Sequence, residues 1–175
     1  MTTAVLARPA PSEHDPYFAK YVALVPQGDL LAVLARQGEE TAALLRSLTA
    51  DQAEHRYAPG KWSVKEVVAH FVDAERVFAY RALRFARGDE TPLPGYDHDL
   101  WTAHADTASR TLESLIEEFI TVRHATLSFA RSLTVESEQR QGPANNASVS
   151  VRALLYLIAG HELHHVAILR ERYGI

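Results

Sequence analysis

Apolar residues recur at three- and four-residue spacings in four long segments, and this spacing is the strongest restriction on the fold of this chain. The first segment runs from Asp29, a residue type that caps helices, to about Leu48. The second begins at Ser63, which forms a capping box with Glu66, and should end near Arg87, before a loop rich in proline and glycine. Both segments are therefore predicted to be amphipathic helices.

Two more helices are predicted in the second half of the chain. One runs from roughly Thr107 to Leu133, and the other runs from Ser148 or Ser150 to Tyr173, before a glycine. The polar, turn-rich stretch between them leaves room for one or two short extended pieces. Four long helices without a convincing strand pattern predict an all-α fold, a four-helix bundle.

The chain length of 175 residues predicts one domain. Residues 1–16 carry Pro9, Pro11 and Pro16 among small and polar residues, so we expect a mobile N-terminal arm there. Residues 17–175 are expected to form the single four-helix-bundle domain.

Composition and charge exclude several kinds of site. The chain has no cysteine, so any metal must be held by histidine, aspartate or glutamate. A net charge of −4 gives no basic surface for nucleic acid or for an anionic membrane. The N-terminus has neither a secretory signal pattern nor a long apolar run, which predicts a cytoplasmic protein.

The sequence HELHH in the last helix places two histidines in the apolar stripe. His161 and His165 lie about 40° apart around the helix axis, near the centre of the stripe, whereas Glu162 and His164 fall on its two flanks. Buried imidazoles need a hydrogen-bond partner or a metal, and this spacing lets both bind one ion. From the pair alone, a hydrogen-bonded core pair and a metal site both stay open.

Two known motifs match this pair only in part. The zinc proteases need a third ligand downstream of His-Glu-x-x-His, but only ten residues follow His165 and Glu171 among them faces away from the stripe. The di-iron carboxylate bundles need two Glu-x-x-His units, and Glu162 with His165 forms the only one in the sequence. Neither class therefore fits.

The best candidate for a third ligand is His70, at the boundary of the apolar face of the second helix. A boundary histidine bonded to Glu66 or Asp73 is the alternative. The remaining histidines lie on the arm, in loops or off the apolar faces, and are expected at the surface: His14, His55, His98, His104 and His124.

Two segments resemble the DinB-like superfamily of small four-helix-bundle metalloproteins, which includes the YfiT-like metal-dependent hydrolases. They are YAPGKWSVKEVVAHFVDAE, which opens the second helix, and LLYLIAGHELHHVAILRERYG near the C-terminus. The resemblance spans roughly Leu30 to Gly174. It implies an up-down-down-up bundle, a homodimer, and a divalent metal ion, zinc or nickel, held by His70, His161 and His165.

The resemblance also limits the expected activity. Family members resemble thiol-dependent transferases, which use bacillithiol, mycothiol or glutathione, or an isomerase acting on maleylpyruvate. Three neutral imidazoles leave a divalent ion its full charge and an open position, which suits a water for hydrolysis or a low-molecular-weight thiol for transfer. We therefore expect a metal-dependent enzyme for thiol transfer or hydrolysis of a small molecule. The alternative is a non-catalytic, metal-stabilised helical module for binding or dimerisation.

Further side chains near the histidines are candidates for supporting roles. Asp73 and Glu162 could each orient an imidazole or act as a general base, or be a solvated charge on a helix flank. The second helix also carries polar groups that either contact an anionic substrate or form only its polar face: Arg76, Tyr80, Arg81 and Arg84.

Overall fold

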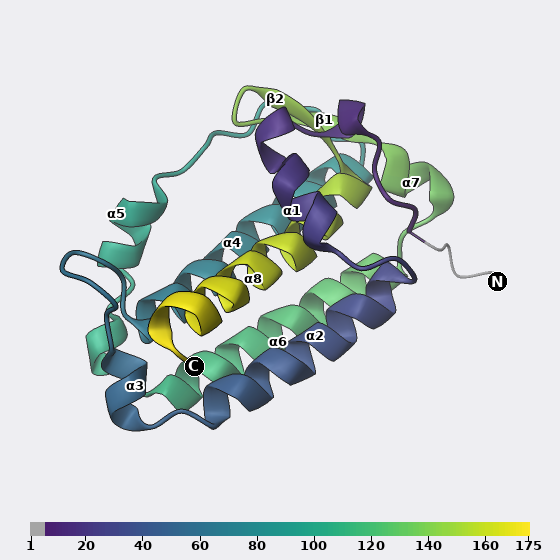
Figure 1. Ribbon diagram of the computed structural model, residues 1–175. Coiled ribbons are helices and arrows are strands. Elements are labelled where there is room, and N and C mark those ends of the chain that lie inside the picture. The colour runs from purple at the N-terminus through teal and green to yellow at the C-terminus, as the bar shows by residue number, and fades with distance from the viewer. Residues whose placement is uncertain (1–5) are drawn as a thin grey trace.

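Four long helices form the body of the molecule in a computed structural model, which describes residues 6–175 (Figure 1). They are α2 (Leu30–Arg46), α4 (Val64–Ala86), α6 (Leu112–Arg131) and α8 (Val151–Tyr173). Each corresponds to a segment that the apolar spacing predicts, which confirms the all-α four-helix bundle. None of the helices within residues 6–175 is long and apolar enough to cross a membrane.

The helix boundaries follow the capping residues. The Ser63 hydroxyl accepts a hydrogen bond from the backbone of Glu66, and the Glu66 carboxylate accepts one from Ser63, as the capping box predicts. The third helix begins later than the predicted Thr107, because residues 107–109 form a separate 3-10 turn (η3, Thr107–Ser109). The helix then starts behind Thr111, whose hydroxyl caps it by accepting from the backbone of Ser114.

The four helices follow an up-down-down-up course. Figure 1 shows α4 and α6 running in the same direction, whereas α2 and α8 run in the opposite one. A bond between Arg46, at the end of α2, and Glu113, near the start of α6, confirms that this neighbouring pair is antiparallel. Since α4 and α6 are parallel, the chain between them must cross the length of the bundle, and it carries α5 (His98–Ala103) on the way.

The connections contain the remaining short elements. These are η1 (Pro11–Glu13), η2 (Pro16–Phe18), α1 (Ala19–Leu24), α3 (Ala50–Glu54), α7 (Val135–Gln139) and the antiparallel hairpin of β1 (Gln141–Ala144) and β2 (Ala147–Ser150). The hairpin turns at Asn145 and Asn146, with φ of 51° and 64°, a conformation that asparagine tolerates better than most residues. The hairpin confirms the short extended pieces expected before the last helix.

Residues 6–16 pack against the bundle, so packing begins before the predicted boundary at residue 16. Leu6 is 2% exposed, and Arg8 donates to the carbonyls of Val22 and Val25. Glu13 accepts two hydrogen bonds from Arg152 of α8, at 2.7 and 2.6 Å. The prolines predict irregular backbone correctly, but irregular backbone can still make specific contacts. The first five residues of the expected arm lie outside the described part of the chain.

A buried ion cluster lies where the four helices meet. Arg123 of α6 donates to Glu75 of α4, to Glu162 of α8 and to the backbone carbonyl of Leu34 in α2. Gly38 makes room for it, because a Cβ there would lie 3.1 Å from Cγ of Arg123. The two apolar halves of the core lie on either side of this cluster.

Candidate metal centre

Helix α8 presents His161 and His165 one turn apart toward α4. The Ser150 hydroxyl caps its start, and Gly174, with φ of 71°, ends it in the left-handed conformation. Nearly every residue from Val151 to Gly160 is buried, so the rotation of the helix is fixed by its packing. The two imidazoles that follow this buried stretch cannot turn to solvent without moving the helix.

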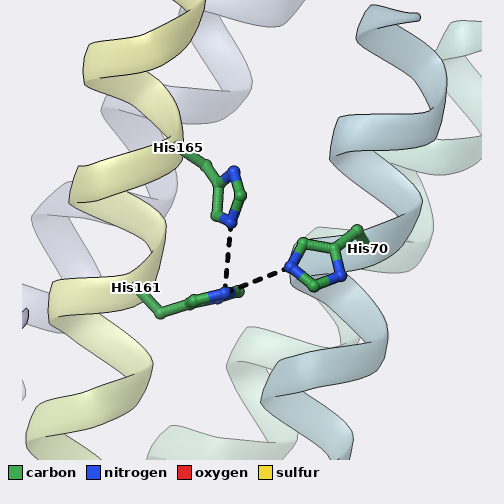
Figure 2. Close-up of side chains that lie close together, drawn as sticks. All are labelled: His70, His161 and His165. Carbon is green, nitrogen blue, oxygen red and sulfur yellow. Dashed lines mark hydrogen bonds between the residues drawn. The ribbon is translucent and has the colours of Figure 1, made fainter. Parts of the chain in front are cut away.

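The ring nitrogens of His70, His161 and His165 converge on one point (Figure 2). Nε2 of His161 lies 3.2 Å from Nε2 of His70 and 3.1 Å from Nε2 of His165. His70 comes from α4 and is 8% exposed. The structure therefore brings together the three histidines that the sequence assigns to one site.

Hydrogen bonding among the three rings cannot satisfy all of them. In a neutral imidazole each ring nitrogen carries either one hydrogen or one lone pair, so Nε2 of His161 can complete only one of its two short contacts. A buried polar atom left without a partner costs about 1–3 kcal/mol. A cation between the rings would accept a lone pair from each nitrogen and remove this cost.

Burial keeps the three imidazoles neutral. It lowers the pKa of His70 to about 4 and that of His165 to about 3, and it lowers the pKa of His161 well below its ordinary value. Repulsion among neighbouring histidines adds to the effect for His161 and His165. At neutral pH each ring therefore keeps one nitrogen without a proton, and that nitrogen can bind a metal.

The spacing of the nitrogens suits a divalent ion. Two nitrogens 3.1–3.2 Å apart, each about 2.0–2.1 Å from a common ion, subtend about 100° at it, which is close to tetrahedral. Imidazole is also a ligand type that such ions prefer. The donor set and its geometry both fit a metal, whereas the alternative of His70 bonded to Glu66 or Asp73 is not found among its contacts in residues 6–175.

A cavity of about 340 Å³ borders the three histidines, which is large enough for a small molecule. No carboxylate of the described residues lines it. Its walls are largely aromatic: Tyr17, Phe18, Tyr21, Trp62, Phe78 and Tyr96.

Close packing of α1 on α8 forms one wall of this cavity. Gly160 permits it, because a Cβ at that position would lie 2.1 Å from the backbone oxygen of Tyr21. The Tyr21 ring packs edge-on against His161, with centroids 5.6 Å apart. Burial raises the pKa of the Tyr21 hydroxyl, so this group keeps its proton at neutral pH.

The two carboxylates expected beside the histidines, Asp73 and Glu162, make their contacts elsewhere. Glu162 is 2% exposed and binds Arg123 in the core, with 2.6 Å between Oε2 and Nη2. Asp73 is half-buried, lies 3.6 Å from Arg76 and faces a different surface hollow. Neither joins the group of potential ligand atoms around the histidines. The contacts of Glu162 correct its expected position on an outer flank, since a charge inside the bundle can be held by a partner on another helix.

Of the four polar residues Arg76, Tyr80, Arg81 and Arg84 on α4, Arg81 alone lines the histidine cavity. Arg76 pairs with Glu118, at 2.5 Å, and Arg84 pairs with Asp89 and donates to Tyr80. These three therefore belong to the polar face of the helix.

Two further histidines, His98 and His164, line the cavity, although nothing in the sequence predicts that they would. His98, at the start of α5, is exposed as expected, but its ring lies 5.7 Å from that of His70. His164 lies on the flank of α8, as its spacing predicts, and its ring is 5.2 Å from that of Tyr21. His14 is 7% exposed, which contradicts its expected surface position, whereas the remaining histidines His55, His104 and His124 are exposed.

Two curated proteins are similar in sequence to this chain. A protein of Oceanobacillus iheyensis named "Putative metal-dependent hydrolase" is 28% identical over 125 residues, which cover 70% of this chain and 71% of that protein. A Bacillus pumilus protein of the same name is 29% identical over 147 residues, 82% of this chain and 81% of its own.

The fold also matches a solved structure. YfiT from Bacillus subtilis, described as "a probable metal-dependent hydrolase with an unusual four-helix bundle topology", superposes with a TM-score of 0.67 at 21% identity. The match covers 96% of this chain and 94% of that one. A sequence profile of the DinB superfamily matches residues 34–169, a range that contains all three histidines. The chain therefore belongs to the DinB superfamily.

Proposed function

We propose that this protein is a metal-dependent hydrolase of a small molecule, with zinc or nickel held by Nε2 of His70, His161 and His165. The observation that carries the proposal is the convergence of three neutral imidazole nitrogens, one from buried His70 and two from half-buried His161 and His165, whose contacts with one another cannot all be hydrogen bonds. The names of the two curated relatives support the same activity.

The number of ligands favours catalysis over a purely structural metal. Structural zinc sites are usually closed by four protein ligands, whereas catalytic sites have three and keep a position for water or substrate. In the described part of the chain the group of potential ligand atoms has three members, and these border a cavity. A metal that only joins α4 to α8 would not need that cavity.

When bound, a divalent ion supplies a Lewis acid that activates water or a thiol at neutral pH. The aromatic walls of the cavity would hold the substrate and exclude bulk water. The Tyr21 hydroxyl keeps its proton and can donate a hydrogen bond to the substrate. His98 and His164 each offer a further ring nitrogen at the cavity wall.

Thiol transfer is the second reaction that this site supports, because an ion with three neutral ligands also favours a thiolate. A low-molecular-weight thiol would then take the place of water as the nucleophile. The two reactions are distinguished by whether turnover needs the thiol.

Metal content tests the site. Elemental analysis of the wild-type protein, purified after exposure to zinc or nickel, should give about one ion per chain. His70→Ala and His165→Ala should each lose most of it. His124→Ala, which changes an exposed histidine of α6, is the matched control and should keep the ion. A wild-type protein without stoichiometric metal would overturn the proposal.

Activity tests the reaction. The metal-loaded protein should hydrolyse members of a panel of small esters and amides, and His165→Ala should not. The same panel, with added electrophiles, is repeated with bacillithiol, mycothiol and glutathione. A protein that binds metal stoichiometrically but is inactive throughout would instead be the non-catalytic helical module.

A further inference from the structure

Arg81 is a buried arginine without a carboxylate partner. Its residue is 7% exposed, and among residues 6–175 its guanidinium makes one hydrogen bond, from Nη2 to the carbonyl of Pro94 at 2.7 Å, and no ion pair. The other buried arginine, Arg123, binds two carboxylates. Burial lowers the pKa of Arg81, but an arginine side chain keeps its charge at neutral pH. Its positive charge is therefore uncompensated within the described protein.

The position of Arg81 connects this charge to the histidine site. Arg81 and the three histidines line the same cavity, which no described carboxylate enters. Lys20 adds positive charge beside it, since its ammonium group lies 4.9 Å from the centre of the Tyr21 ring. A cavity with low-dielectric walls and charges of one sign attracts ligands of the opposite sign.

The hydrogen bond to the Pro94 carbonyl does not by itself explain why the residue at position 81 is an arginine. One carbonyl needs one donor, whereas the guanidinium has five N–H groups in a rigid fork. That fork matches the two oxygens of a carboxylate or a phosphate, and such charge-assisted pairs are among the stronger hydrogen bonds in proteins.

We propose that Arg81 binds an oxyanion, a carboxylate or a phosphate, of the small molecule that occupies this cavity. The carbon body of the ligand would lie against the aromatic walls, and its reacting bond would lie at the histidines. Only the position of the reacting bond rests on the proposed hydrolase function. The oxyanion site itself requires no metal.

Binding to the metal-free protein tests this site. Three probes share a phenyl ring: benzoate, phenyl phosphate and neutral benzamide. In calorimetric titrations at low salt, the wild type stripped of metal should bind at least one of the two anions about 10- to 100-fold more tightly than benzamide. Which anion binds more tightly distinguishes a carboxylate site from a phosphate site.

Variants assign the preference to Arg81. Arg81→Gln should bind anion and amide equally, and Arg81→Lys, which keeps the charge but not the fork, should retain part of the preference. The matched control is Arg87→Gln, the same change at an exposed arginine that caps the end of α4, and it should behave as wild type. Thermal melts establish that each variant is folded.

The proposal is overturned if the wild type binds neither anion at millimolar concentration, binds both no better than benzamide, or keeps its preference in folded Arg81→Gln and Arg81→Lys. Because these titrations use metal-free protein, they give the same answer whether or not the protein hydrolyses anything. Metal content, measured separately by elemental analysis, distinguishes failure of the metal site from failure of the oxyanion site.

Discussion

Arg123 of α6 and Glu162 of α8 form a buried ion pair, with 2.6 Å between Nη2 and Oε2. Glu162 directly follows His161 in the sequence, so this pair lies on the side of α8 that faces the core while the histidine faces the cavity. Glu75 shares the same guanidinium, and burial raises the pKa of Glu162. One charged residue thus holds two carboxylates inside the bundle.

Replacing this arginine should destabilise the protein strongly. Arg123→Met leaves two buried carboxylates without a counter-ion, and breaking a buried pair in this way costs about 3–5 kcal/mol. Urea unfolding followed by circular dichroism measures the loss.

The control for this prediction removes all three charges. Arg123→Met combined with Glu75→Met and Glu162→Met replaces the cluster with apolar side chains of similar size, which is often neutral or stabilising. This triple variant should recover most of the lost free energy of unfolding. If it unfolds at the same urea concentration as Arg123→Met alone, loss of packing and not unpaired charge explains the effect.

Gly160→Ala should destabilise the protein although alanine is the better helix former. In an exposed helix the change would gain about 1 kcal/mol. Here the new Cβ would lie 2.1 Å from the backbone oxygen of Tyr21, so α1 must move away from α8. We expect a net loss of about 1–3 kcal/mol, as for other overpacked sites.

A thermal melt compares Gly160→Ala with Gly38→Ala, the same change in the interior of α2. The Cβ at position 38 would meet only the side chain of Arg123, at 3.1 Å, so the second variant should lose less. If Gly160→Ala melts at a higher temperature than Gly38→Ala, α1 does not pack against α8 as described.

The helices and two of the three candidate metal ligands can be predicted from the sequence because their signals are local. The capping box at Ser63 and Glu66 and the apolar spacing involve residues one turn apart, and the same holds for His161 and His165. The start of α6 differs from the predicted one because threonine caps helices at either position, Thr107 or Thr111. The left-handed backbone at Asp106 and the extended backbone at Arg110 make residues 107–109 a separate turn.

The rest of the site depends on contacts between distant segments. Glu162 sits on a flank of α8 by its spacing, and only the arginine of another helix makes that flank a buried position. His98 reaches the cavity because the connection between the two parallel helices α4 and α6 must cross the bundle. No residue near His98 in the sequence predicts this crossing. For the same reason, the uncompensated charge of Arg81 could be found only after its neighbours were known.

Metal should stabilise the fold as well as occupy the site, because the three histidines join α4 to α8. A ligand that binds only the folded state at 100 times its Kd adds about 2.7 kcal/mol. Thermal unfolding in the presence of zinc or nickel should therefore occur at a higher temperature than in the presence of a chelator. His165→Ala should abolish the difference, whereas His164→Ala should keep it. An identical melting temperature with metal and with chelator in the wild type would contradict the prediction.

Glu13→Gln should lower the free energy of unfolding at neutral pH and have a smaller effect on it in acid. Hydrogen bonds from Arg152 lower the pKa of Glu13 from an ordinary 4.5 to about 2 in the folded protein. A carboxyl group whose pKa falls on folding stabilises the fold above its ordinary pKa, and this contribution is lost as the pH drops through 4 toward 2. This pKa shift corresponds to a contribution of about 3 kcal/mol to the free energy of unfolding. Urea unfolding of wild type and Glu13→Gln at pH 7, 4 and 3 should give free energies that differ most at pH 7 and converge in acid. A difference that stays constant with pH would mean that the ion pair with Arg152 does not hold the N-terminal segment to α8.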